Sequence, residues 1–168
     1  MQQNVPVEFT LGVAYPAPPA TVFGMLTTSE FLQRCCVESG ARRQAVEVTP
    51  STVSVSLEVE SPAAARPLVG QVMTIQQRFS WGEPDAAAGR DGIMQLAIAG
   101  SPLTLTGTCR LRPTAQGTEV DYTGDLVAAV PLLGRRIEQL AQPEFEEGFR
   151  VTERVGRAWL TERGLATS

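Results

Sequence analysis

Apolar and polar residues alternate along most of the chain up to residue 129, which is the period of a half-buried strand. In the first such segment, 5–15, Val7, Phe9 and Leu11 share one face, and Glu8 and Thr10 lie on the other. The same alternation predicts further strands at 42–48, 52–60, 71–81, 93–99, 103–112 and 117–129. Because the outward positions are mostly Ser, Thr, Glu and Asp, the strands predict an antiparallel sheet with one face in water.

The last part of the chain, 132–164, has helical periodicity instead. One apolar stripe recurs at three- and four-residue steps and contains Phe145, Phe149, Thr152, Gly156 and Trp159. This pattern predicts a long amphipathic helix that closes the chain. Pro143 lacks an N–H group and fits the first turn of a helix, so the helix is predicted to bend or restart there.

Two short helices are predicted between the first two strands, at 19–26 and at roughly 30–37. The segment 61–70 is rich in Pro and Ala and has no strand pattern, so it is interpreted as a connector or as a lid over one end of a cavity. The expected fold class is α+β, with a curved antiparallel sheet of about seven strands wrapped around the long C-terminal helix. We expect residues 1–168 to form a single domain.

Two glycines lie on or beside the apolar stripe of the closing helix, Gly148 and Gly156. Each costs a helix about 1 kcal/mol relative to alanine. Close packing of the helix on the sheet is the first explanation, because small residues are common at helix interfaces. The alternative is that they leave space for a ligand.

The composition excludes several kinds of chemistry. The net charge is −4, which disfavours nucleic acid as a partner, and no apolar run approaches the length of a membrane span. There is no histidine, and all 14 basic residues are arginine. Catalysis through a Ser-His-Asp or Cys-His arrangement, Schiff-base chemistry and histidine metal sites are therefore excluded. No cofactor or metal site is expected. No export signal is visible, so a cytoplasmic location is expected.

The order of elements resembles the START-like (SRPBCC, or Bet v 1-like) helix-grip superfamily, which also contains polyketide cyclases and aromatases. Single motifs are most similar to the actinobacterial family DUF2505: Tyr15-Pro16, the PATVFGMLT helix, Gly117-Thr118, Val130 to Gly134 followed by Glu138, and Trp159-Leu160. This resemblance implies a START-like domain with a cavity between the sheet and the C-terminal helix. In the superfamily such cavities commonly hold hydrophobic molecules. The resemblance supplies no set of catalytic residues that could be carried over to this sequence.

The inward faces of the predicted elements supply the candidate ligand-binding residues. They are mostly apolar with a few polar groups, as ligand pockets usually are, although each also fits an ordinary core position. The candidates are Tyr15, Met73, Gln77, Phe79, Trp81, Cys109, Tyr122, Phe145, Phe149 and Trp159. No acidic residue is predicted on the inward face. The adjacent Cys35 and Cys36 are interpreted as small residues at a helix end, because no histidine is present to activate a thiol.

Three functions remain open. The first is non-catalytic binding of a hydrophobic small molecule, lipid-like or polyketide-like, in the cavity. The second is a cyclase- or aromatase-like enzyme that folds a reactive substrate, with Tyr122 or an inward acid moving protons. The third is a domain with a filled core that binds a protein partner through its outer face, which lacks an apolar patch. The absence of an inward acid favours the first over the second.

Overall fold

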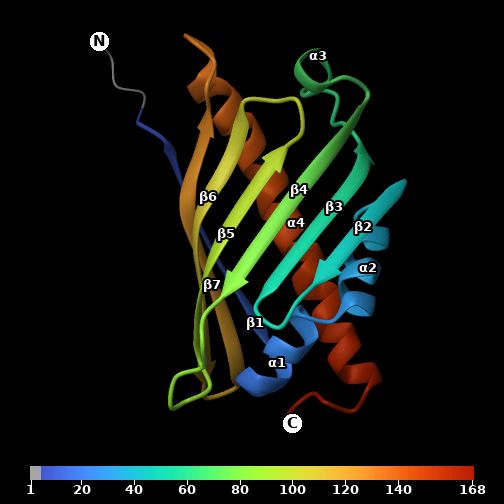
Figure 1. Ribbon diagram of the computed structural model, residues 1–168, viewed down its shortest axis with the longest axis vertical. Coiled ribbons are helices and arrows are strands. Elements are labelled where there is room, and N and C mark those ends of the chain that lie inside the picture. The colour runs from blue at the N-terminus through green and yellow to red at the C-terminus, as the bar shows by residue number, and fades with distance from the viewer. Residues whose placement is uncertain (1–4) are drawn as a thin grey trace.

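The computed structural model describes residues 5–168, and its main element is a seven-stranded antiparallel sheet (Figure 1). The strands are β1 Val7–Tyr15, β2 Arg43–Val48, β3 Thr52–Glu60, β4 Val72–Trp81, β5 Arg90–Ile98, β6 Leu103–Thr114 and β7 Gly117–Ala128. Their order in the sheet is β1-β7-β6-β5-β4-β3-β2. Consecutive strands from β2 to β7 therefore pair with each other, and β1 pairs with β7. The predicted strands are confirmed.

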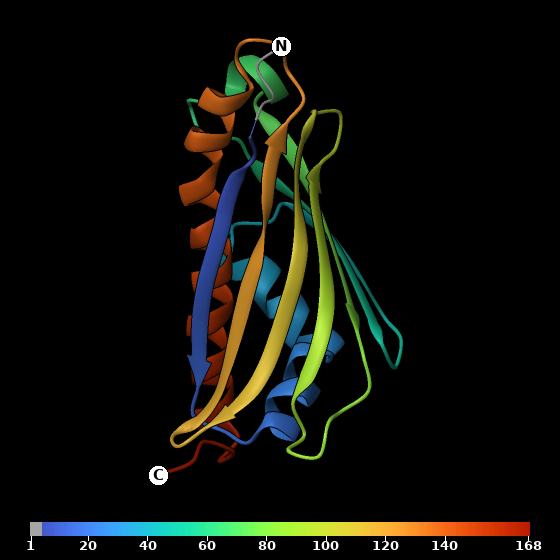
Figure 2. The same cartoon turned by 90° about the vertical axis from the view of Figure 1, so that its left-hand side faces the viewer.

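The helices lie on the inner face and at the ends of this sheet (Figures 1 and 2). They are α1 Pro19–Leu26, α2 Ser29–Glu38, α3 Arg66–Val69 and α4 Gly134–Glu162. The long helix α4 runs along the inner face, α1 and α2 lie at one end of it, and α3 lies at the opposite end (Figure 2). The predicted α+β helix-grip fold is confirmed.

Side-chain burial follows the alternation that predicted the strands. In β1, Phe9, Val13 and Tyr15 are almost inaccessible, while their neighbours are exposed. In β5, whose facing the sequence leaves ambiguous, Met94, Leu96 and Ile98 are buried. These β5 residues pair in register with residues of β4 and β6, so the inner face is continuous across these three strands.

The predicted restart of the closing helix at Pro143 is wrong, whereas a bend there stays a prediction. α4 is one helix of 29 residues, and Pro143 lies inside it rather than in its first turn. Pro143 is exposed, so the carbonyl of Gln139, which loses its N–H partner, faces solvent. Packing on both sides of the proline outweighs the lost bond: Glu138 and Phe145 are both buried against other elements.

The prediction that no acid lies on the inward face is also wrong. Glu138 is fully buried, and its Oε1 accepts a hydrogen bond of 2.9 Å from the backbone N–H of Ala128, at the end of β7. The other carboxylate oxygen, Oε2, has no hydrogen-bond partner among residues 5–168. This bond joins the first turns of α4 to the last residue of β7, and it therefore helps to fix the position of the start of α4 relative to the sheet.

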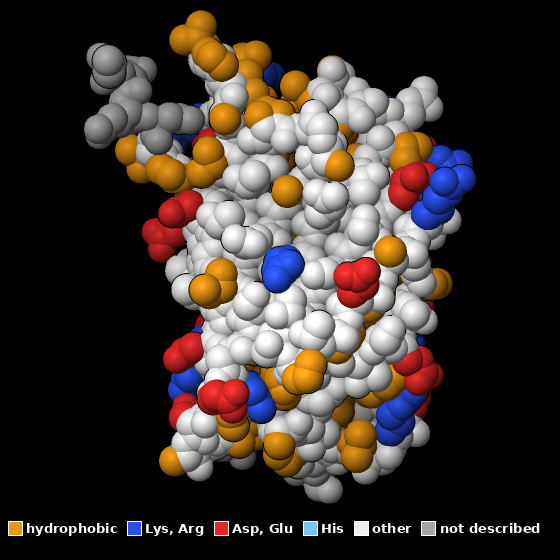
Figure 3. Space-filling model, viewed as in Figure 1, with side chains coloured by type: hydrophobic (Ala, Val, Ile, Leu, Met, Phe, Trp, Pro, Cys, Tyr) orange, Lys and Arg blue, Asp and Glu red, His pale blue; other side chains and the backbone are white. Residues whose placement is uncertain are grey.

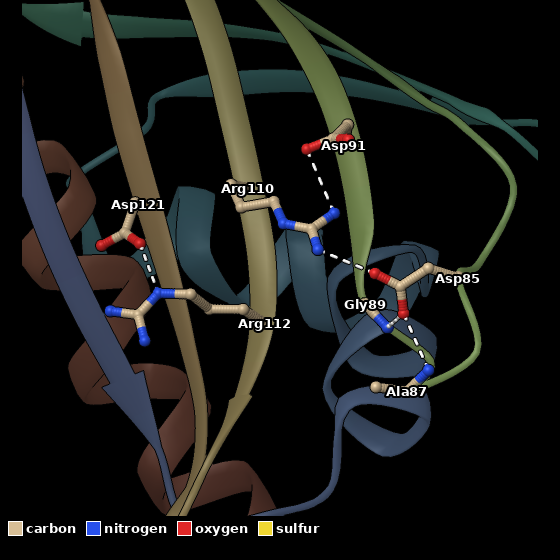
Figure 4. Close-up of polar contacts among 7 residues, drawn as sticks. All are labelled: Asp85, Ala87, Gly89, Asp91, Arg110, Arg112 and Asp121. Carbon is tan, nitrogen blue, oxygen red and sulfur yellow. Dashed lines mark hydrogen bonds and ion pairs between the residues drawn. The ribbon is translucent and has the colours of Figure 1, made fainter.

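The sheet's outer face is polar and carries cross-strand ion pairs (Figure 4). The Arg110 guanidinium lies 2.7 Å from Asp85 and 3.1 Å from Asp91, and Arg112 lies 2.8 Å from Asp121. Asp85 also accepts hydrogen bonds from the N–H groups of Ala87 and Gly89, which shapes the loop between β4 and β5. The bond from Arg110 and these two N–H groups lower the pKa of Asp85. The ion pairs of Arg110 and Arg112 thus connect neighbouring strands on the outer face, and Asp85 connects the β4–β5 loop to β6.

The two glycines of α4 differ in their surroundings. A Cβ atom on Gly156 would lie 2.5 Å from Cε1 of Tyr15 and 2.9 Å from Cε of Met25, so this glycine permits close packing of α4 on β1 and α1. A Cβ atom on Gly148 would meet nothing within 4 Å. The close-packing explanation therefore holds for Gly156 and is wrong for Gly148.

We expect Gly156→Ala and Gly148→Ala to change stability in opposite directions. Overpacking at Gly156 should lower the free energy of unfolding by about 1–3 kcal/mol. At Gly148 the better helix propensity of alanine should raise it by up to about 1 kcal/mol. Urea denaturation followed by circular dichroism measures both. Equal effects of the two substitutions would contradict the assigned packing.

Candidate functional site: a cavity between sheet and helix

A cavity of about 340 Å³ lies between the inner face of the sheet and α4. Its walls come from β3, β4 and β5 on the sheet side, from α2, and from the α4 residues between Ile137 and Thr152. The segment that contains α3 closes one end through Pro62, Leu68 and Val69. This segment, predicted as a connector or a lid, is part of the wall. Cavities that bind small molecules usually measure about 300–1,000 Å³.

The buried hydrophobic residues form two separate clusters, and the cavity lies between them. α4 packs mainly on β1, β7 and α2. Most buried apolar residues belong to one cluster built around these elements, whereas Cys36 and the inward residues of β3 form a second cluster. Leu32, Met73 and Phe79 are partly buried and pack against both clusters. All three line the cavity, which therefore occupies the space between the two clusters.

Three aromatic rings from β4, β7 and α4 form one wall. The ring centroids of Tyr122 and Phe149 are 4.2 Å apart, and those of Phe79 and Tyr122 are 6.4 Å apart in an edge-on arrangement. Tyr122 is only 4% exposed. Burial, and to a smaller extent the nearby Cys109, Cys35 and Glu153, raise the pKa of Tyr122 far above its ordinary value. Its hydroxyl stays protonated and can donate a hydrogen bond to a ligand.

Further neutral polar side chains line the cavity: Gln77, Ser101 and Thr152 are half-buried, and Ser39 is exposed. Gln77 is half-buried on β4, where its register partners are Val55 and Leu96. The Thr152 hydroxyl donates to the backbone carbonyl of Gly148 at 3.2 Å. Apolar walls with a few neutral hydrogen-bonding groups suit an uncharged, mainly hydrophobic molecule that carries an oxygen.

The mouth of the cavity is lined by exposed residues of α4, β3 and the α3 segment. Leu68 and Leu140 lie there with half of their surface exposed, at 50% and 52%. The charged residues that line the cavity are Glu60, Glu144 and Glu147, all exposed. Gly148 lies beside them, and its missing side chain leaves the opening clear.

A family model described as "Protein of unknown function (DUF2505)" matches residues 10–160. The chain belongs to this family. The match covers the sheet and nearly all of α4, and it confirms the resemblance that the sequence motifs indicate. Among curated proteins, this DUF2505 chain has no match. In residues 5–168, no helix combines the length and the hydrophobicity needed to cross a membrane.

Solved structures share the fold of this DUF2505 protein at low sequence identity. A STAR-related lipid transfer protein from Xanthomonas axonopodis is 16% identical, with a TM-score of 0.60 over 92% of this chain and 85% of that one. The Zhui aromatase/cyclase from Streptomyces sp. R1128 is 16% identical, with a TM-score of 0.59 over 94% and 93%. The di-domain ARO/CYC protein StfQ of the steffimycin biosynthetic pathway is 14% identical, with a TM-score of 0.65 over 94% and 52%. At these identities the likeness shows the fold alone.

The structure brings seven of the ten candidate ligand-binding residues together around the cavity. These are Met73, Gln77, Phe79, Trp81, Tyr122, Phe145 and Phe149. They come from β4, β7 and α4, which face each other across the cavity. Their position is that of a ligand-binding wall, and their role in binding stays a prediction.

The other three candidates, Tyr15, Cys109 and Trp159, lie outside the cavity lining. Tyr15 is 2% exposed and packs beneath Gly156, so its ring fills the contact between β1 and α4. Cys109 lies in the sheet next to Gly92. Trp159 packs edge-on against Phe31 of α2, with 5.5 Å between ring centroids. They share the inward face with the lining residues but lie where α1 and α2 fill the space.

The candidate set omitted several lining residues. The inward row of β3 contributes Val53, Val55, Leu57 and Val59, and α2 contributes Leu32 and Cys35. The alternation of β3 already identified its row as inward. What the sequence did not show was that the helix leaves this row uncovered, because that depends on the position of α4.

The cysteines are free thiols in buried positions. Burial raises the pKa of Cys35 to about 12, with a smaller contribution from Cys36, and burial also raises the pKa of Cys109 to about 12. Both remain neutral thiols at physiological pH. This supports their interpretation as small apolar residues rather than nucleophiles.

We therefore expect the folded protein to resist alkylation by iodoacetamide at about pH 8. With the pKa of Cys35 and of Cys109 raised from 9.0 to about 12, the thiolate fraction of these two residues falls on the order of 10³-fold, and their rate of reaction falls with it. Intact-mass measurements over time, beside protein unfolded in guanidinium as the control, follow the modification. Equal rates of modification in the folded and unfolded protein would contradict the assigned burial.

Proposed function

We propose that the protein binds a hydrophobic small molecule in the cavity between β3–β5 and α4, without catalysing a reaction on it. The observation that carries this proposal is the cavity of about 340 Å³ between the sheet and α4, with its mainly apolar lining residues. An unfilled apolar space of this size lowers stability, since buried side chains lose contacts there. A bound apolar ligand would restore those contacts.

The names of structurally similar proteins support this class of ligand. One is named as a lipid transfer protein and another as an aromatase/cyclase, and the first name refers to a hydrophobic cargo of that protein. The expected partner of this chain is accordingly a lipid-like or polyketide-like molecule. The expected cytoplasmic location also remains part of the proposal.

Binding without catalysis fits the position of the acidic groups better than the cyclase-like alternative. The buried carboxylate, Glu138, lies outside the cavity lining and is bonded to Ala128. The acids that do line the cavity are exposed at its mouth. Tyr122 and Cys35 line the cavity, and burial raises the pKa of both groups, so both stay protonated and suit hydrogen bonding to a ligand better than acting as a base.

The variant Gly148→Leu tests the proposal, because a leucine there would extend into open space at the mouth. The apolar fluorescent probe N-phenyl-1-naphthylamine should bind the wild type with enhanced emission. Its affinity for Gly148→Leu should be at least about tenfold lower, since the side chain occupies part of the site. Fluorescence titration measures both values.

Gly24→Leu is the matched control. Gly24 is also exposed on a helix, and a Cβ atom there would likewise meet nothing within 4 Å, but it lies on α1 away from the cavity lining. This variant should bind the probe like the wild type. Unchanged affinity in Gly148→Leu, or no binding by the wild type, would overturn the proposed site.

A further inference from the structure

The charged groups around the cavity share one sign. Glu60, Glu144 and Glu147 line it, whereas no arginine does among the described residues, although the chain contains 14. Two arginines near the mouth are already paired with these acids. Arg66 lies 3.4 Å from Glu60, and Arg154 lies 2.9 Å from Glu147.

Glu144 is the acid at the mouth that forms no ion pair within residues 5–168. It follows Pro143 on α4, is exposed, and lies one turn before Gly148, which leaves the entrance open. A ligand entering past Gly148 would therefore meet a free carboxylate. The negative potential there attracts a cationic group and repels an anionic one.

The interior offers only neutral partners. Tyr122 is more than nine-tenths buried and lines the cavity. Gln77, Ser101 and Thr152 are half-buried neutral polar residues of the same lining. These groups can bind a carbonyl or hydroxyl oxygen. None of them could neutralise a carboxylate or phosphate, and a buried anion without a counter-charge is strongly destabilised.

We infer that the cavity selects amphiphiles whose polar end is cationic or uncharged, and that it discriminates against anionic amphiphiles such as fatty acids. This inference rests on the proposed function. The apolar chain occupies the space between β3–β5 and Phe149. The oxygen or nitrogen of an uncharged group bonds to Tyr122 or Gln77, and a cationic end stays at the mouth beside Glu144.

Three ligands of equal chain length test the inference: dodecylamine, 1-dodecanol and dodecanoate. Each is titrated at low ionic strength against the protein loaded with N-phenyl-1-naphthylamine. The amine should bind at least about tenfold more tightly than dodecanoate, with the alcohol between them, because the charge at the mouth changes the interaction from attraction to repulsion. Added salt should reduce this difference and leave the affinity for the alcohol unchanged.

Glu144→Arg should reduce the ratio of amine to dodecanoate affinity roughly tenfold, since it reverses the free charge at the mouth. Glu83→Arg is the matched control. It changes the net charge equally, from an exposed position in the loop between β4 and β5, at the opposite end of the sheet from α3 (Figure 1). This control should leave the ratio unchanged.

The outcomes separate this inference from the proposed function. Dodecanoate binding as tightly as the amine, or an equal response of the ratio in Glu144→Arg and Glu83→Arg, would overturn the charge selection alone. If none of the three ligands, including the uncharged 1-dodecanol, displaces the probe, the proposed hydrophobic site itself is overturned.

Discussion

The contact between Gly156 and Tyr15 determines how α4 lies on the sheet. A side chain at position 156 would collide with the tyrosine ring, so glycine lets the helix approach β1 closely at this point. Nearer the start of the helix, at Gly148, there is open space beside it instead. α1 and α2 fill the end of the fold near Gly156, and α3 only closes the other end (Figure 2). The cavity lies beside the part of α4 that contains Gly148, and Gly156 lies outside its lining.

The chemistry of the cavity follows from the same arrangement. Because the apolar face of β3 forms its own cluster apart from the main core, the cavity has hydrophobic walls on both sides. The rings of Tyr122, Phe149 and Phe79 form part of these walls, and the Tyr122 side chain stays protonated because burial raises its pKa. The outer face presents polar side chains with only scattered hydrophobic and charged groups (Figure 3). That surface gives little support to the protein-interaction alternative, whereas the cavity supports small-molecule binding.

The sequence predicts the fold well because burial in a one-sided sheet repeats every second residue, as in β1 and β7. It predicts part of the site for the same reason: Gln77 and Tyr122 fall on the inward face. It cannot distinguish Tyr15 from Tyr122, because both face inward and only the position of α4 decides which one is covered. Glu138 was recognised only as a motif residue, because its burial and its hydrogen bond to Ala128 depend on how α4 packs at the end of β7. That residues 1–168 form a single domain stays a prediction.

Native mass spectrometry of the freshly purified protein tests the central claim, that the space beside α4 is a binding site for a hydrophobic molecule. The account predicts a reproducible adduct that is lost on denaturation, or an adduct that forms when an apolar ligand such as 1-dodecanol is added. A protein that carries no adduct as purified and forms none with added ligand would contradict the account, and would mean that the cavity stays empty.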